Sequence, residues 1–188
     1  MNILLLNGSP RNYGATQEIL KTLKDAAPEE AQAELLCLGD FAIGYCKGCK
    51  ACYETGACVL KDGMGLLLEK LSWADILVFA IPSYWADVPG LCKSFIDRCT
   101  PYGDTNPDEG HPALGKGKRC YGIALRAGQR PMECEHILDT IRHWCGHMGL
   151  EMAEGIFFCQ IEDKLDIEPH KPLLREKAGQ WFGAALSI

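Results

Sequence analysis

Short apolar runs alternate with stretches of helical periodicity along most of the chain. A short apolar run bounded by turn residues is typical of a buried strand, whereas apolar positions three and four residues apart mark one face of a helix. The third run is too apolar for a strand with one face in water. The runs predict five strands, at Ile3–Leu6, Ala33–Leu38, Asp75–Ile81, Arg119–Leu125 and Ile156–Ile161.

A helical pattern follows each predicted strand, although a cysteine-rich segment comes first after the second one. The expected helices cover about residues 15–27, a stretch from about Gly63, the segment after Pro89, Met132–His147, and a last stretch from about Lys171 that packs through Leu174, Ala178, Trp181, Phe182 and Ala185. Residues 100–117 hold four glycines and three prolines, which predicts a long surface excursion.

Strands that alternate with helices form a parallel sheet with both faces covered. A chain of 188 residues is long enough for one domain with a substantial core. No internal repeat, low-complexity segment or linker divides it. We therefore predict one α/β domain over residues 1–188, a three-layer sandwich around a five-stranded parallel sheet.

Composition and charge narrow the classes of function. Hydrophobic residues make up 47% of the chain and charged residues 23%, which is globular composition. The formal net charge of −6 argues against nucleic-acid binding, which favours basic surfaces. The apolar runs are too short for a membrane span, and the first is too short for a signal peptide. We expect a cytoplasmic protein that binds neither nucleic acid nor a membrane.

The segment Asn7–Thr16, between the first predicted strand and the first helix, is suited to phosphate binding. Its glycines permit a tight turn, Arg11 carries a positive charge, and Ser9 and Thr16 carry hydroxyls. The N–H groups at the start of a helix attract anions. Neither a Walker loop nor the dinucleotide pattern G-x-G-x-x-G is present. The alternative is a plain connecting turn.

Gly8-Ser9-Pro10-Arg11 with Gly14-Ala15-Thr16 resembles the FMN phosphate loop of the flavodoxin-like NAD(P)H-dependent flavin reductases, where the usual form is close to G-S-P-R-x-x-G-N-T. Ala15 replaces an Asn of that form, which costs one side-chain hydrogen bond to the ligand. The resemblance implies a flavodoxin-like fold with strand order 2-1-3-4-5. It also implies that FMN contacts Ser9, Arg11, Tyr13, Gly14, Ala15 and Thr16.

Two further segments are expected at the same rim of the sheet, where ligands of this fold bind. The stretch after the third strand, with Phe95-Ile96-Asp97-Arg98, resembles the P-x-Y-W…P…K-x-F-I-D-R signature of the same family. This resemblance assigns Pro82, Ser83, Tyr84, Trp85 and Val88 to the flavin ring, and by analogy Arg126, Ala127 and Gly128 after the fourth strand to flavin or substrate. The alternatives are core aromatics and a solvated loop.

Four of the eleven cysteines form the pattern Cys46-x-x-Cys49-x-x-Cys52-x₅-Cys58, inside a loop at about residues 44–61. Such compact spacing suits an iron–sulfur cube better than the paired knuckles of zinc sites. It resembles the iron–sulfur flavoproteins, which carry a [4Fe–4S] cluster beside FMN. Structural or redox-active thiols, a disulfide and zinc remain alternatives. The other seven cysteines lie among apolar neighbours and are expected in the core.

The sequence therefore predicts an FMN-dependent oxidoreductase with a [4Fe–4S] cluster that couples one-electron and two-electron carriers. The flavin carries the chemistry, so no catalytic side chain is predicted. The alternatives are an NAD(P)H-dependent FMN or quinone reductase without a cluster and a non-enzymatic electron carrier. Expected small-molecule partners are NAD(P)H and an electron acceptor. Ferredoxin or another acidic redox protein is expected to dock on Lys47, Lys50 and Lys61. The chain is also expected to form a homodimer or homotetramer.

Overall fold

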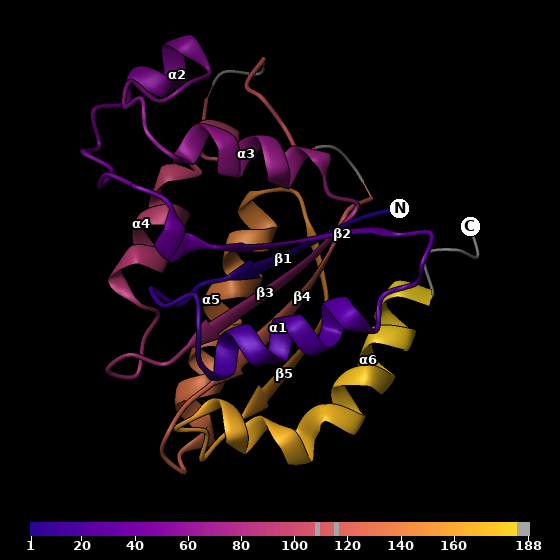
Figure 1. The fold of residues 1–188 in the computed structure, drawn as a ribbon. Coiled ribbons are helices and arrows are strands. Elements are labelled where there is room, and N and C mark those ends of the chain that lie inside the picture. Colours follow the sequence, from indigo (N-terminus) through magenta and orange to yellow (C-terminus); the bar gives the residue numbers. More distant parts are fainter. Residues whose placement is uncertain (108–109, 115–116, 184–188) are drawn as a thin grey trace.

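A parallel five-stranded sheet with the order β2-β1-β3-β4-β5 organises the computed structural model, which describes residues 1–107, 110–114 and 117–183. The flavodoxin-like strand order expected from the family resemblance is thus confirmed. The strands are β1 (Asn2–Asn7), β2 (Gln32–Cys37), β3 (Ile76–Pro82), β4 (Arg119–Leu125) and β5 (Glu151–Phe158). Their carboxyl ends share one edge, at the left in Figure 1.

Helices cover both faces of the sheet and make a three-layer sandwich (Figure 1). One face carries α1 (Ala15–Asp25) and α6 (Lys171–Gly183). The other carries α3 (Met64–Trp73), α4 (Gly90–Arg98) and α5 (Pro131–His147). A short helix, α2 (Ala51–Thr55), and three 3-10 segments, η1 (Leu38–Asp40), η2 (Thr100–Tyr102) and η3 (Lys164–His170), complete these elements.

The central strands are apolar on both sides because each side has its own core. Successive residues of a strand point to opposite faces. Ile3 and Leu5 of β1 therefore pack with α1 and α6, whereas Leu4 and Leu6 pack with α3, α4 and α5. Six residues of β3, Ile76–Ile81, are fully buried, as its apolar run predicted.

The fifth strand was placed too late by the sequence pattern. It begins at Glu151 and ends at Phe158, instead of covering residues 156–161. Its pairing with β4 shifts register between Cys120 and Tyr121, which breaks the alternation of apolar and polar positions. It is also an edge strand, where Glu154 accepts a hydrogen bond of 2.6 Å from Nε1 of Trp181 in α6.

The segment 100–117 was predicted to run over the surface, but some of its described residues are buried. Pro101, Asn106 and Leu114 are buried. The Asn106 side chain donates a hydrogen bond of 3.2 Å to the Pro101 carbonyl. A Cβ on Gly56 would touch Pro112, so this segment packs against the cysteine-rich loop. The glycine and proline content indicated its irregular backbone but not its packing partner.

Two other expectations concern the last helix and the absence of a membrane span. The last predicted helix is confirmed as α6 through Phe182, but Ala185 lies outside the described residues. Within the described ranges, no helix has both the length and the apolar character that a membrane span requires.

Candidate functional site

The loop after β1 is shaped by Asn7, a fully buried polar residue at the end of the strand. Its Oδ1 accepts a hydrogen bond of 2.9 Å from the backbone N–H of Ser9. Its Nδ2 donates to the Arg11 carbonyl at 3.2 Å and to Oε1 of Gln17 at 2.9 Å. Asn7 was not among the predicted site residues. A polar side chain that ends an apolar strand was the signal that could have found it.

The rest of this loop is defined by the close approach of Gly8 to β3 and by the start of α1, which has no capping side chain among the described residues. The backbone N–H of Gly8 donates to the Ala80 carbonyl at 2.8 Å, and a Cβ on Gly8 would lie 3.0 Å from Cγ1 of Ile81. Gly14, with a φ of 99°, precedes α1 and supplies no capping side chain. Among the residues that the structure describes, no side chain caps the first N–H groups of α1, which is the arrangement that binds anions at helix N-termini.

A cavity of about 360 Å³ at the carboxyl edge of the sheet, the rim pocket, collects residues from four separate segments. It brings together most of the residues that the sequence assigned to FMN. Its lining is Ser9, Arg11, Tyr13, Ala15, Thr16, Pro82, Ser83, Tyr84, Leu125, Arg126, Ala127, Ile161 and Glu162. Leu125, Ile161 and Glu162 were not predicted. Leu125 and Ile161 had been placed inside the fourth and fifth predicted strands, and Glu162 directly follows the fifth.

Four predicted residues do not line the rim pocket. Gly14 shapes the backbone beside it. Val88, which was assigned to the ring, is buried in the core and does not line the rim pocket. Trp85 and Gly128 line a neighbouring hollow of about 460 Å³ that shares Ser83, Arg126 and Ala127 with the rim pocket.

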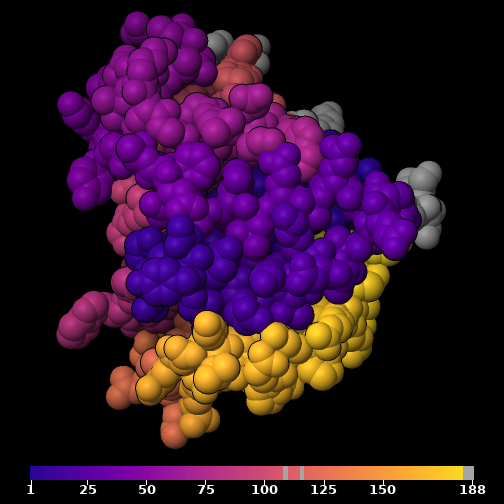
Figure 2. Space-filling view, in the orientation of Figure 1, coloured from indigo at the N-terminus to yellow at the C-terminus, as the bar shows by residue number. Residues whose placement is uncertain are grey.

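The predicted aromatic wall is split by a tight turn. Tyr84 and Asp87 exchange backbone hydrogen bonds of 2.8 and 3.1 Å. The two residues between them, Trp85 and Ala86, have φ angles of 53° and 64°, a conformation that side chains disfavour. Tyr84 therefore faces the rim pocket while Trp85 is fully exposed. Figure 2 shows the segment between β3 and α4 standing out from the body of the molecule.

A network of charged side chains lies behind the rim pocket. Nη1 of Arg126 is 2.6 Å from Oε1 of Glu133, and it donates to the Arg130 carbonyl at 3.2 Å. The Ser83 hydroxyl donates to the other carboxylate oxygen of Glu133 at 3.4 Å. Nε of Arg126 is buried and has no hydrogen-bond partner among the described residues. It is therefore a donor that a bound molecule can satisfy.

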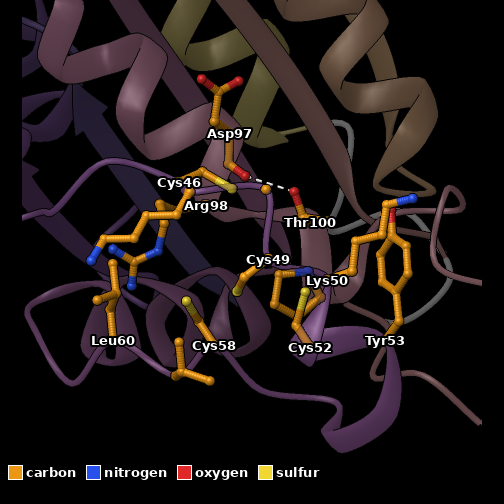
Figure 3. A pocket seen from close by; sticks show the side chains of 14 residues that line it. Cys46, Cys49, Lys50, Cys52, Tyr53, Cys58, Leu60, Asp97, Arg98 and Thr100 are labelled. Carbon is orange, nitrogen blue, oxygen red and sulfur yellow. Dashed lines mark hydrogen bonds between the residues drawn. The ribbon is translucent and has the colours of Figure 1, made fainter.

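A second cavity of about 200 Å³, the cysteine pocket, contains all four clustered cysteines (Figure 3). Left-handed backbone at Gly48, Lys50 and Gly56 wraps the loop tightly around α2. The ends of α4 and η2 form the opposite side. The structure thus brings Cys46, Cys49, Cys52 and Cys58 around one space.

The other three clustered thiols lie near enough to Cys52 to affect its charge, but the four do not converge on one ion. The pKa of Cys52 is raised, mainly by burial and further by the nearness of Cys58, Cys46 and Cys49. In the part of the chain that the structure describes, no three His, Cys, Asp or Glu side chains are close enough to hold a metal ion. Four thiols around one cavity are a donor set that a [4Fe–4S] cluster uses.

The two pockets lie at opposite ends of α4. The helix begins directly after the turn at Tyr84 to Val88, and its last residue, Arg98, lines the cysteine pocket. Its nine residues at a rise of 1.5 Å each span about 13 Å. The turn and α4 together therefore connect Tyr84 in the rim pocket with Arg98 in the cysteine pocket.

Curated proteins that are similar in sequence to this chain include iron-sulfur flavoproteins. An iron-sulfur flavoprotein from Archaeoglobus fulgidus is 34% identical over 150 residues, which are 79% of this chain and 65% of that protein. A second iron-sulfur flavoprotein from that organism is 38% identical over 99 residues, 52% of this chain and 48% of that protein. The chain thus spans about half to two thirds of the length of these curated relatives.

A solved structure agrees in fold. An FMN-dependent NADH-azoreductase from Bacillus anthracis, crystallised in complex with FMN, superposes with a TM-score of 0.70 at 14% identity, covering 97% of this chain and all of that one. The sequence model of the family described as NADPH-dependent FMN reductase matches residues 1–150, which include the loop after β1, the end of β3 and the four clustered cysteines. The chain therefore belongs to the NADPH-dependent FMN reductase family.

Proposed function

We propose that the chain is an FMN-dependent oxidoreductase, with FMN in the rim pocket and a [4Fe–4S] cluster in the cysteine pocket. When bound, FMN supplies redox chemistry that accepts two electrons together and releases them singly, while a cluster moves one at a time. The observation that carries the proposal is the rim pocket itself, which joins the segments that resemble the FMN site. Family membership and the names of the curated relatives support it.

The residues of the rim pocket have separate roles in this proposal. Ser9 Oγ accepts the Arg11 backbone N–H at 3.1 Å, which leaves the hydroxyl hydrogen free to donate to a phosphate oxygen. No carboxylate of the described residues pairs with the Arg11 guanidinium, so its charge is available to the same phosphate. Nε of Arg126 donates to a polar edge of the ring, and Glu133 keeps the guanidinium in place.

FMN binding is tested by fluorescence titration of the apo-protein. Arg11→Gln should weaken FMN binding about ten- to a hundredfold, because a hydrogen bond to a charged group contributes about 1.5–3 kcal/mol. Arg175→Gln, an exposed arginine on α6, is the matched control and should leave the affinity unchanged. FMN binding that is equally tight in all three proteins would contradict the assignment of the phosphate to this loop.

The cluster is tested on protein purified and reconstituted without air. We expect about four irons and four acid-labile sulfides per FMN, lost on replacing Cys49 and Cys52 by Ser but kept on replacing the buried core cysteine Cys92 by Ser. An FMN-loaded protein without iron would support the second candidate, a reductase without a cluster. The lack of three convergent metal ligands in the described residues favours that candidate.

Electron donors distinguish the remaining alternatives. We propose NAD(P)H as a co-substrate, so NADH or NADPH should bleach the flavin without air.

Lys47 and Lys50 are exposed and unpaired within the described residues, and both line the cysteine pocket. They favour docking of an acidic redox protein such as ferredoxin. Lys47→Glu with Lys50→Glu should then slow reduction by ferredoxin in a salt-dependent way, and an unchanged rate would reject ferredoxin docking there.

A further inference from the structure

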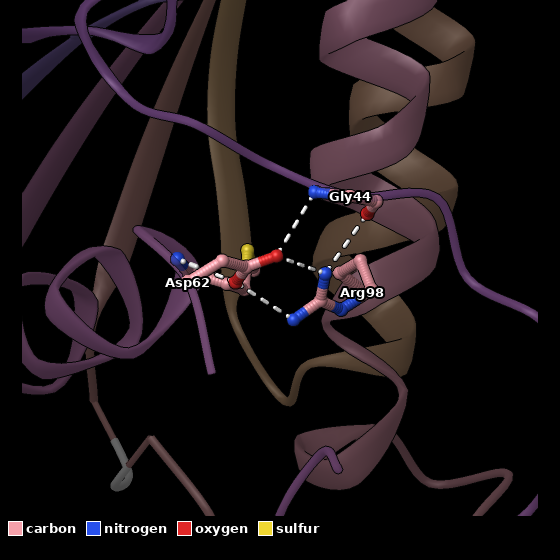
Figure 4. Close-up of polar contacts among 4 residues, drawn as sticks. Gly44, Asp62 and Arg98 are labelled. Carbon is pink, nitrogen blue, oxygen red and sulfur yellow. Dashed lines mark hydrogen bonds and ion pairs between the residues drawn. The ribbon is translucent and has the colours of Figure 1, made fainter. Parts of the chain in front are cut away.

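The cysteine pocket has a buried positive charge in its wall. The side chain of Arg98, the last residue of α4, is only 1% exposed. Its Nη1 lies 2.7 Å from Oδ2 of Asp62 and donates to the Gly44 carbonyl at 2.8 Å, and its Nη2 donates to Oδ1 of Asp62 at 2.9 Å (Figure 4). Two parallel hydrogen bonds to one carboxylate fix the guanidinium in a single orientation.

The Asp62 carboxylate also accepts hydrogen bonds from backbone N–H groups. Its Oδ2 accepts the backbone N–H of Gly44 at 2.9 Å, and its Oδ1 accepts that of Met64 at 3.1 Å. The hydrogen bonds from Arg98 are the largest cause that lowers the pKa of Asp62, to about 2. Both partners therefore carry their charges at neutral pH.

This ion pair closes the loop that contains all four cysteines. Gly44 and Asp62 flank the segment from Cys46 to Cys58, and Arg98 binds both of them. Joining the ends of a loop reduces the number of conformations available to the residues between them. The pair thus restricts the four thiols to the neighbourhood of α4 without touching most of them.

The positive member of the pair is the one that faces the pocket. Arg98 lines the cysteine pocket, together with Cys58, and Asp62 does not (Figure 3). Nε of Arg98 is buried and has no hydrogen-bond partner among the described residues. The wall of the pocket therefore contains the positive end of a buried ion pair, on the side where Cys58 lies.

We propose that Arg98, anchored by Asp62, is a positioning residue of the cysteine pocket that closes the segment 44–62 and favours the reduced state of the group held there. The second part rests on the [4Fe–4S] cluster of the proposed function. A cluster gains one negative charge on reduction, and nearby positive charge and hydrogen bonds to its sulfurs raise its potential. Arg98 lines the cysteine pocket and not the rim pocket.

The charge effect is tested by measuring the midpoint potential of the cluster without air. Arg98→Gln removes the positive charge and should lower the ratio of reduced to oxidised cluster at a fixed potential at least tenfold, which is about 59 mV for one electron. Asp62→Asn leaves Arg98 unneutralised and should shift the potential in the opposite direction. Arg98→Lys keeps the charge and should stay near the wild-type potential while losing iron faster to a chelator.

Opposite signs for Arg98→Gln and Asp62→Asn distinguish electrostatics from mere loosening of the loop, which would shift both potentials alike. The control is Arg142→Gln, an exposed arginine that pairs with Asp139 on α5. The double variant R98Q/D62N leaves no unpaired buried charge, and its potential should lie between those of the single variants even where R98Q folds poorly. Shifts of the same sign, or none beyond the control, would overturn the charge effect.

The loop-closing effect is tested without any cluster. Trypsin should cleave the apo-protein after Lys47 and Lys50 at least tenfold faster in R98Q than in the Arg142→Gln control. Equal cleavage rates would overturn the positioning role. A wild-type protein without iron and sulfide would remove the cluster from the proposed function and the potential effect from this inference, and the cleavage rates would then decide whether Arg98 positions the cysteines.

Discussion

A Cβ atom on Gly128 would lie 2.3 Å from Nη2 of Arg126, so the guanidinium occupies the space that any other residue would fill. The bond from Nη1 of Arg126 to Glu133, at 2.6 Å, prevents the side chain from moving aside without loss. Gly128 was predicted to contact the ligand. In the structure it makes room for Arg126, which lines the rim pocket.

Gly128→Ala is therefore expected to displace Arg126 and weaken FMN binding about five- to tenfold, the equivalent of one neutral hydrogen bond of about 1 kcal/mol. The free energy of unfolding should change by less than about 1 kcal/mol, because the Arg126 side chain is partly exposed and can move toward solvent. Fluorescence titration and urea unfolding measure both quantities. Gly179→Ala, a helical position with no atom within 4 Å of the added Cβ, should leave FMN binding intact.

Ala15 stands where the related loops have Asn, and it lines the rim pocket at the start of α1. Ala15→Asn should tighten FMN binding about five- to tenfold, because it restores one hydrogen bond worth about 1 kcal/mol. Isothermal titration of the apo-protein measures the effect. Ala15→Leu adds similar bulk without an amide, and an equal gain from Leu would show that the hydrogen bond is not the cause.

The turn at Trp85 and Ala86 holds two L-residues in left-handed backbone, with φ angles of 53° and 64°. Ala86→Gly should raise the free energy of unfolding by up to about 1 kcal/mol, since the relief of left-handed strain exceeds the entropy cost of glycine. Urea unfolding of the apo-protein provides the measurement. Ala26→Gly, at a φ of −101°, should instead lose about 0.5–1 kcal/mol. Destabilisation by both substitutions would contradict the strain at Ala86.

The Asp62–Arg98 pair predicts a specific pH dependence. The pKa of Asp62 is lowered to about 2, so its contribution to stability is complete above its unfolded pKa, near 4, and is lost as the pH falls through 2. Asp62→Asn should cost about 3–5 kcal/mol at pH 7 because Arg98 remains buried without its partner. The difference in unfolding free energy between wild type and variant should shrink as the pH is lowered from 4 to 2.

The measurement is urea unfolding at a series of pH values between 2 and 7. Asp139→Asn, which removes the exposed partner of Arg142, serves as the control and should cost less than about 1 kcal/mol. A difference between wild type and Asp62→Asn that is constant from pH 7 to pH 2 would show that the buried pair does not depress the pKa of Asp62.

Local patterns were sufficient for the central strands, for the helices on both faces and for the turn between β1 and α1. The period of a strand or helix is a property of neighbouring residues, and β1, β3 and β4 are enclosed on both faces, so their apolar runs were unambiguous. The edge strand β5 was misplaced because its register shift and its glutamates disturb that period. The spacing of the four cysteines predicted an iron–sulfur centre. The structure places them around one pocket, although no three metal-ligating side chains of the described residues are close enough to hold an ion.

The sequence by itself determined that the segments Asn7–Thr16, Pro82–Val88 and Arg126–Gly128 would meet at one edge, because parallel strands end together. Only the tertiary structure decided which charges support the pockets. Asp62 and Arg98 are 36 residues apart, and Ser83 and Glu133 are 50 apart. Such contacts depend on how α4 and α5 cross the sheet and where the loops return to it. No local period encodes that geometry.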